Sequence, residues 1–286
     1  MVIRPEPDAL RESPIPNGFS LPNEFITSHK ITTHSFLPAW QAVARRQTLV
    51  APSYCLIRQP DHAALSGELA TQFRSGGFPN LTADAIQAIG QHDSGWSAFP
   101  FEAALDLDPP VSGAGHPMSF LEFGPEDFLQ AWKGSIDNAG RISPLAGRMV
   151  SGHFYRLGQG RLAARVDNDP NARCLEEFLD FENSRQRRLE RNIPLSAAEI
   201  EALVNVLQFC DVLSLYLCCG AEEAVEFPQT LAGCRIQLQF VDGVFRFNPS
   251  PFHEVVNPQL VRSSVSATRY PHPSGPEITR LNFSLS

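Results

Sequence analysis

Four side chains in this sequence have the chemistry to bind one divalent cation together. They are His62, His92, Asp93 and Asp211, and each falls at an apolar face of a predicted helix. Mixed imidazole and carboxylate ligands suit divalent first-row metals such as zinc, manganese, nickel and iron. A carboxylate buried in an apolar stripe is costly unless it is paired, hydrogen-bonded or bound to a cation. We therefore favour a metal site, and a purely structural polar network stays open as the alternative.

The helix predicted over residues 197–219 has the clearest pattern. Ser196 and Glu199 form an S-x-x-E capping box at its start, and Gly220 stands just past its end. Asp211 lies in the middle of the apolar stripe of this helix, so its carboxylate is expected to point into the core.

The two histidines of the set lie on other predicted helices. His62 lies on the apolar stripe of a helix predicted over residues 61–74. His92 and Asp93 are adjacent and straddle the apolar stripe of a helix predicted over residues 83–93. Because they straddle the stripe, both side chains can point inward. Helical phase is thus the reason to expect the four side chains to converge.

A fifth candidate is His153. It follows Ala146, Met149 and Val150 at helical spacing in a helix predicted over residues 144–157, so it also faces inward. We predict that His153 is a further metal ligand or a catalytic general acid or base.

Two more helices, over residues 125–139 and 172–191, complete the predicted bundle. The segment 97–124 is rich in glycine, proline and aspartate, and we expect a long loop that closes over the site. We predict that the substrate pocket is lined by Trp96, Phe99, His116 and Arg148.

After the last predicted helix the periodicity changes from helical to alternating. Residues 235–247 (RIQLQFVDGVFRF) predict a hairpin whose turn is Asp242–Gly243. Residues 278–286 alternate as well, and residues 48–51 and 54–57 resemble short strands. The predicted fold class is mainly α (α+β): a helical bundle with a small antiparallel β-sheet formed by C-terminal and N-terminal strands.

The chain divides into two predicted parts. Residues 1–47 are rich in proline and predict an extended N-terminal arm. Residues 48–286 predict a single domain, with the C-terminal β-hairpin region at about 235–286.

Composition excludes several function classes. The net charge of −8 lacks the basic footprint of a nucleic-acid-binding protein and the basic attraction of a peripheral membrane protein. We see no apolar run of about 18 residues and no signal peptide, so we expect a cytoplasmic protein without a membrane partner. The six cysteines show no C-x-x-C spacing, which favours reduced thiols over a zinc-thiolate site.

The order H…HD…D resembles the signature of the HD superfamily of metal-dependent phosphohydrolases, which carry it on a helical bundle. More closely, the chain resembles, over about residues 48–270, an uncharacterised bacterial family of unknown function with an HDxGW motif. The resemblance implies an HD-like helical domain with metal ligands at His62, His92, Asp93 and Asp211, and it brings no established activity. The segments that carry it are QPDHAALSGELA (59–70), HDSGW (92–96), GHPMSFLEF (115–123), WKGSI (132–136), VSGHF (150–154), DVLSLYLC (211–218) and NPSPF (248–252).

The HD resemblance implies a metal-dependent hydrolase that acts on a phosphorylated, hence anionic, small molecule. One departure weakens this hypothesis: Ser-Gly-Trp follows the His92–Asp93 pair, whereas many HD hydrolases place a phosphate-contacting lysine there.

Two alternatives stay open. Some HD proteins are di-iron oxygenases with extra histidines between the HD pair and the last aspartate, the interval that holds His116 and His153 here. A non-enzymatic metal- or ligand-binding module is the other alternative, with a homodimer contact through the hairpin and the phenylalanine-rich segment 240–252.

Overall fold

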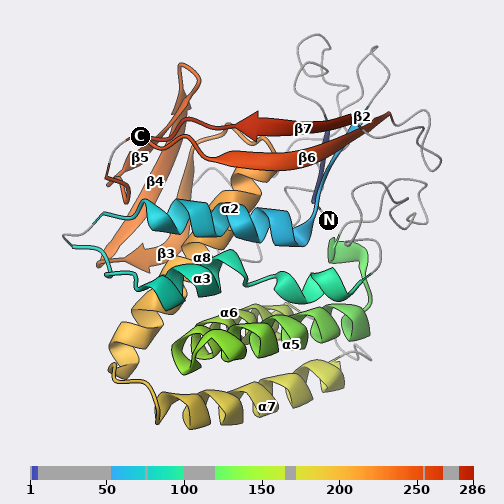
Figure 1. Cartoon of the computed structure of the whole chain (residues 1–286), viewed down its shortest axis with the longest axis vertical. Helices are drawn as coiled ribbons and strands as arrows, with labels where there is room; N and C mark the ends of the chain where they lie inside the picture. The colour runs from blue at the N-terminus through green and yellow to red at the C-terminus, as the bar shows by residue number, and fades with distance from the viewer. Residues whose placement is uncertain are drawn as a thin grey trace.

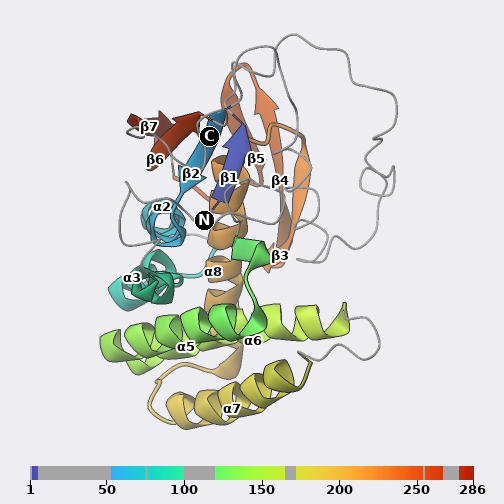
Figure 2. The ribbon, with the colours of Figure 1, turned by 90° about the vertical axis from the view of Figure 1, so that its right-hand side faces the viewer.

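A computed structural model describes residues 2–5, 53–74, 77–99, 120–164, 172–253, 255–266 and 277–286. Most of the helices gather at one end of the molecule and two antiparallel sheets lie at the other (Figure 1). The long helix α8 (Ala197–Cys218) runs from the helical end towards the sheets (Figure 2). The predicted mainly helical class with a small antiparallel sheet is therefore confirmed.

The six predicted α-helices are all present, and some of their ends differ by several residues. The 3₁₀ helices η3 (Ser94–Ala98) and η4 (Phe120–Glu122) accompany them. The α-helices are α2 (Gln59–Thr71), α3 (Ala83–Gly90), α5 (Pro125–Ile142), α6 (Pro144–Ala163), α7 (Ala172–Glu190) and α8.

Local capping explains where several helices begin. The Thr82 side chain accepts a hydrogen bond from the backbone of Ala85 at the start of α3. Ser143 caps α6 in the same way, and Ser196 and Glu199 form the complete capping box of α8. Each cap satisfies backbone N–H groups that have no partner inside the helix.

The helix α3 ends at Gly90, so its predicted extension to residue 93 is wrong. Gly67 of α2 crosses Gly90 so closely that a Cβ atom on Gly67 would lie 2.6 Å from the Gly90 Cα. Beyond this crossing the chain turns and re-enters a helix as η3. A turn therefore carries His92 and Asp93.

Among the described residues, α8 is the helix that is long and apolar enough to cross a membrane. Most of that helix is buried inside the protein, where it packs on α2, α6 and the strand that follows it. A buried core helix passes the same test of length and composition, so α8 is the central helix of this fold.

The strands form two sheets, where we had expected one. The first has the order β1-β2-β6-β7 and joins N-terminal and C-terminal strands as predicted. The hairpin instead belongs to the second sheet, of order β3-β4-β5, so its expected pairing with the strands near residue 50 is wrong. The strands are β1 (Val2–Pro5), β2 (Ser53–Ile57), β3 (Val225–Leu231), β4 (Cys234–Val241), β5 (Val244–Asn248), β6 (Gln259–Ser266) and β7 (Glu277–Asn282).

The hairpin has the predicted turn, with positive φ at both Asp242 and Gly243. Phe245, Phe247 and Phe252 from this region are buried in the core. These three rings are therefore not available for the homodimer contact considered there, whereas other residues of the segment 240–252, such as Val241, are exposed.

The N-terminal arm contributes β1, which pairs antiparallel with β2. The rest of the predicted arm, the predicted strand 48–51, most of the predicted loop (residues 100–119) and with it His116 lie outside the described residues.

Candidate metal centre

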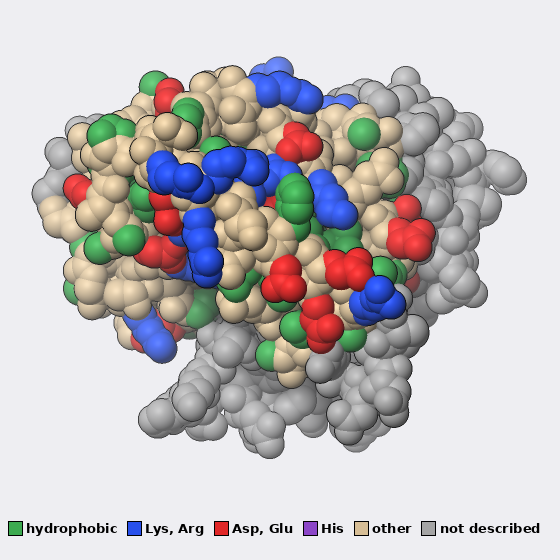
Figure 3. Space-filling view, turned by 90° about the horizontal axis from the view of Figure 1, so that it is seen from below, with side chains coloured by type: hydrophobic (Ala, Val, Ile, Leu, Met, Phe, Trp, Pro, Cys, Tyr) green, Lys and Arg blue, Asp and Glu red, His purple; other side chains and the backbone are tan. Residues whose placement is uncertain are grey.

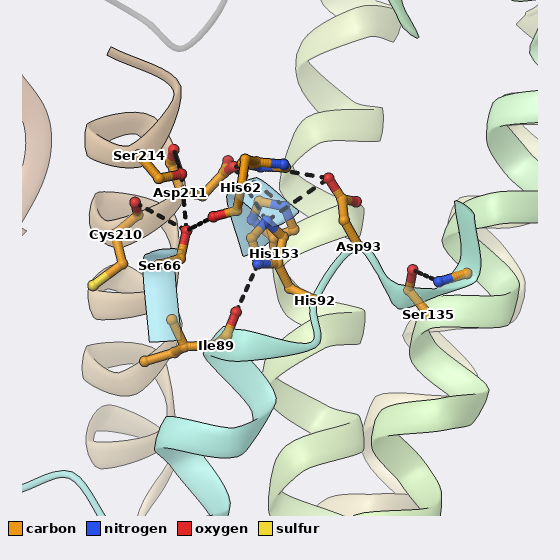
Figure 4. Close-up of polar contacts among 11 residues, drawn as sticks. His62, Ser66, Ile89, His92, Asp93, Ser135, His153, Cys210, Asp211 and Ser214 are labelled. Carbon is orange, nitrogen blue, oxygen red and sulfur yellow. Dashed lines mark hydrogen bonds and ion pairs between the residues drawn. The ribbon is translucent and has the colours of Figure 1, made fainter. Parts of the chain in front are cut away.

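Four side chains converge at one point between α2, α8 and the turn that follows α3 (Figure 4). The Nε2 atoms of His62 and His92 lie 3.1 and 3.2 Å from Asp211 Oδ1. Asp93 Oδ2 lies 3.6 Å from His62 Nε2 and 3.8 Å from His92 Nε2. The structure therefore brings together the four residues that the sequence assigned to a metal.

Two serines fix the helices α2 and α8 relative to each other beside the cluster. The Ser66 hydroxyl lies 2.9 Å from Ser214 Oγ and 3.2 Å from the Cys210 carbonyl oxygen. Ser214 in turn donates a hydrogen bond to the Asp211 carbonyl oxygen at 2.8 Å. Because Ser66 lies one helical turn after His62, these bonds hold His62 and Asp211 in register. Both serines were absent from the predicted site, although their spacing from the ligands could have indicated them.

A close backbone contact fixes the turn that carries His92 and Asp93. The Gly95 N–H donates a hydrogen bond to Ser135 Oγ at 2.9 Å. A Cβ atom on Gly95 would lie only 2.0 Å from the Ala131 carbonyl oxygen. The HDSGW and WKGSI segments therefore interlock, and this contact docks the turn on α5.

The orientation of His92 is set by its second ring nitrogen. Its Nδ1 lies 2.7 Å from the Ile89 carbonyl oxygen, which can only accept a hydrogen bond, so Nδ1 carries a proton. The other nitrogen, Nε2, faces the Asp211 carboxylate, which is also only an acceptor when ionised. Either a second proton or a cation must therefore lie between His92 and Asp211. Metal-binding histidines commonly donate their far N–H to a carbonyl in this way.

The electrostatics favour a positive charge at this point. Burial lowers the pKa of His92, but the hydrogen bond that its ring donates to Asp211 and the charges of Asp93 and Asp211 outweigh burial and raise that pKa to about 9. Hydrogen bonds from His62 and His92 outweigh burial at Asp211 and hold the pKa of its carboxyl well below the usual range. Burial raises the pKa of Asp93. In the metal-free protein, a proton on His92 therefore balances the Asp211 carboxylate.

His153 lies at the edge of the cluster. Its Nε2 is 3.9 Å from Asp211 Oδ2, and its ring centroid is 5.3 Å from that of His92. The side chain is fully buried, and its Nδ1 has no hydrogen-bond partner. Burial lowers the pKa of His153 to about 3, so the ring is neutral at physiological pH. A neutral imidazole with so low a pKa is a weak base and cannot act as a general acid, but its free lone pair can bind a metal.

The aromatic side chains of the predicted pocket pack into the interior. Trp96 is buried, and its ring contacts those of Phe99 and Phe123 at centroid distances of 5.5 and 5.6 Å. These ring contacts help to hold η3, the segment that directly follows His92 and Asp93.

Arg148 does not line the cluster. Its Nε lies 2.7 Å from Glu190 Oε1, and its Nη2 lies 2.8 Å from Glu201 Oε1. Glu201 is ten residues before Asp211 on α8, about 15 Å along the helix axis. The predicted substrate contact through Arg148 is therefore wrong, because the guanidinium joins α6 to α7 and α8.

A family model matches residues 47–265, a span that includes the whole cluster; the family is described as "Protein of unknown function (DUF3891)". The chain belongs to the DUF3891 family. The predicted membership of an uncharacterised family is therefore confirmed, and the family description assigns no activity. Neither the curated proteins nor the solved structures contain a significant match to this DUF3891 protein.

The charge balance of the centre predicts opposite pH dependences for the metal-free and metal-loaded protein. The folded pKa of His92, about 9, exceeds its unfolded value of 6.5. The proton on His92 therefore stabilises the folded, metal-free protein by about 3 kcal/mol at most. This stabilisation is complete below pH 6.5 and is lost as the pH rises through 9. A metal displaces this proton, so metal affinity should rise over the same interval.

Thermal unfolding at several pH values, with a chelator and with added zinc or manganese, measures both slopes. His92→Gln should flatten the decline of the metal-free protein, whereas His253→Gln, at an exposed histidine, should leave it unchanged. Parallel pH profiles with and without metal would contradict the assignment of this proton to His92.

Proposed function

We propose that this DUF3891 protein is a metal-dependent hydrolase of the HD type that acts on a phosphorylated small molecule. The main support is the distance between donor atoms from separate elements. Ligand atoms about 2.0–2.2 Å from one ion lie roughly 3.0–3.5 Å from their neighbours. The distances from Asp211 to His62 and His92 fall in this range, and those from Asp93 are slightly longer.

The donor atoms of His62, His92 and Asp211 all lie within 4.8 Å of one another, and we propose Asp93, 3.6 and 3.8 Å from the two imidazoles, as the fourth ligand of a divalent cation. Two imidazoles and two carboxylates suit zinc, manganese, nickel or iron. The thiol of Cys210 points away from the cluster (Figure 4), and burial raises its pKa, so it stays protonated. A bound cation would lower the pKa of a coordinated water and polarise a phosphoryl oxygen.

Burial indicates the side from which a substrate would approach. His62 and His92 have no exposed surface, whereas Asp93 and Asp211 retain 8% and 7%. The imidazole side of the centre is therefore fully buried, and the carboxylate side is the one with some exposure to solvent. Two carboxylates and neutral histidines would balance a divalent cation, so the loaded site would not repel an anionic ester.

His153 is the residue that we propose for proton transfer. It is neutral, it lies beside Asp211, and it has an unsatisfied buried nitrogen. A ring with so low a pKa is a weak base in the metal-free protein, so the proposed role rests on its position beside Asp211, where a cation-bound water would be a stronger acid than free water. The alternative of a second metal bound through His153 would favour the di-iron oxygenase. A cytoplasmic location also belongs to this proposal, and the free cysteines support it.

Turnover of phosphate esters tests the proposed reaction. The metal-free protein would be loaded separately with zinc, manganese, nickel or ferrous iron and assayed with nitrophenyl phosphate mono- and diesters. We expect hydrolysis with at least one metal, and a loss of about 100-fold or more in His153→Gln at unchanged metal content. His253→Gln is the control, because it removes an exposed histidine and keeps every proposed ligand.

Other outcomes discriminate between the hypotheses. Metal binding without hydrolysis of any ester would overturn the hydrolase proposal and favour the binding module. Iron with a mixed-valent spin-resonance signal and oxygen consumption would favour the oxygenase.

A further inference from the structure

The outer face of α7 carries opposite charges in its two halves. Glu177 and Asp180 are exposed in the N-terminal half, and Arg187 and Arg188 are exposed near the C-terminal end. Arg191 is exposed in the turn that follows. Seen from below, basic side chains gather over one half of this face and a group of acidic side chains over the other (Figure 3).

The inner face of α7 is already occupied. Leu175, Phe178 and Leu179 are buried, and α7 packs on α6 and α5. Figures 1 and 2 show α7 as the outermost helix at the helical end of the molecule. Its outer face is therefore presented to solvent in the described structure.

An exposed aromatic ring interrupts the charged face at its centre. Phe181 is the middle residue of α7, and 53% of its surface is exposed. The Arg185 guanidinium lies 5.0 Å from its ring centroid. The small residue Ser184 follows one turn later and is also exposed. The ring alone does not mark a contact surface, but together with the two groups of opposite charge it gives this face a pattern that a second protein surface can complement.

We propose that α7 is a self-association surface on which a second copy of this chain docks in antiparallel orientation, with the two-fold axis at Ser184. Glu177 and Arg191 lie seven residues before and after Ser184, and Asp180 and Arg188 lie four residues before and after it. A two-fold axis there places Glu177 opposite the partner's Arg191 and Asp180 opposite the partner's Arg188.

The same axis gives the exposed ring a partner. Phe181 and Arg187 lie three residues before and after Ser184, so Phe181 faces the partner's Arg187 in a cation–π contact. Offsets of three, four and seven residues all lie on one helix face. The small Ser184 at the crossing point allows the two helices to approach closely.

Charge complementarity selects a second copy as the occupant. A parallel arrangement would place like charges opposite each other, and the acidic half would repel nucleic acid or an anionic membrane. The existing pair of Glu177 with Arg173 is exposed and contributes little, so it does not prevent the new contact. One helix makes a small interface, so we expect a weak dimer that salt dissociates.

Sedimentation velocity of the full chain tests the surface. At low salt and high protein concentration the mass should rise from 31.5 kDa towards twice that value, and 0.5 M salt should reverse the rise. Two charge-reversed variants should each remain monomeric: Glu177→Arg/Asp180→Arg and Arg188→Glu/Arg191→Glu. Mixed in equal amounts, they should associate with each other, because every reversed pair becomes complementary again. Arg246→Glu on β5 is the exposed control and should dimerise normally.

Cross-linking tests the position of the axis. In a background with Cys174 and Cys234 changed to serine, Ser184→Cys should be joined to its partner by a short bismaleimide. With Ser184 intact, the exposed Cys174 should not be cross-linked, because the two Cys174 positions lie about 30 Å apart along the helices. A monomeric wild type at low salt, a mixture that fails to associate, or equal cross-linking at both positions would overturn the proposal.

Discussion

Asp211→Ala is expected to abolish metal binding, with a loss in affinity of well over 100-fold. Asp211 is the one residue whose carboxylate lies within 4 Å of ring nitrogens of His62, His92 and His153 in the described structure. Loss of an outer-shell partner alone typically costs about 10–100-fold in affinity, and removal of a direct ligand costs more. The metal-free protein should also lose about 3 kcal/mol at pH 6.5, since the buried imidazolium of His92 loses its counter-charge.

Metal content after dialysis and thermal unfolding with a chelator measure these two effects. Asp127→Ala is the control, because it removes an exposed carboxylate from the first turn of α5, away from the cluster. It should keep the metal. If Asp211→Ala keeps a full equivalent of metal, the ligand assignment is wrong.

Gly95→Ala is expected to destabilise the fold by about 3 kcal/mol or more and to weaken metal binding. Its Cβ atom would lie 2.0 Å from the Ala131 carbonyl oxygen and 2.5 Å from the Ser135 backbone nitrogen. Both contacts are with the backbone of α5, which cannot move away cheaply. The turn must therefore shift, and the adjacent ligands His92 and Asp93 shift with it.

Denaturant unfolding and metal titration of Gly95→Ala, beside a control variant on α5, measure how the docking of the turn affects stability and metal affinity. Gly140→Ala is the control on α5, because a Cβ atom there meets nothing within 4 Å. It should be neutral or stabilising by up to about 1 kcal/mol, since alanine favours the helix. A Gly95→Ala protein with wild-type stability and metal affinity would contradict the proposed docking of the turn on α5.

The convergence of His62 and Asp211 could be predicted from the sequence because helical phase is local. A residue in the middle of an apolar stripe faces the core whichever helix packs against it. The capping box at Ser196 and Glu199 likewise located the start of α8. Both inferences depend on the 3.6-residue period and on hydrogen bonds between near neighbours.

The position of His92 and Asp93 was predicted correctly although their helix was not. The sequence suggested that α3 continues to residue 93, but it ends at Gly90. The close crossing of Gly67 with Gly90 and the docking of Gly95 are both contacts between distant segments. A single sequence shows the glycines but does not show which backbone each one meets.

The remaining differences have the same physical origin. Arg148 shares a helix with His153, yet its position is decided by Glu190 and Glu201 from two other helices. Alternating residues predicted the hairpin but gave no information about which sheet it would join. Pairing partners across long separations are fixed by the packed structure and leave no local pattern.

X-ray absorption of the zinc-loaded protein tests the central claim most directly. The account predicts about one zinc per chain, bound by nitrogen and oxygen atoms at about 2.0–2.2 Å, with two imidazoles and no sulfur. The signal of one imidazole should disappear in His62→Gln and in His92→Gln. Sulfur scattering at about 2.3 Å, or less than about 0.1 equivalent of any transition metal after reconstitution, would contradict a metal centre at these four residues.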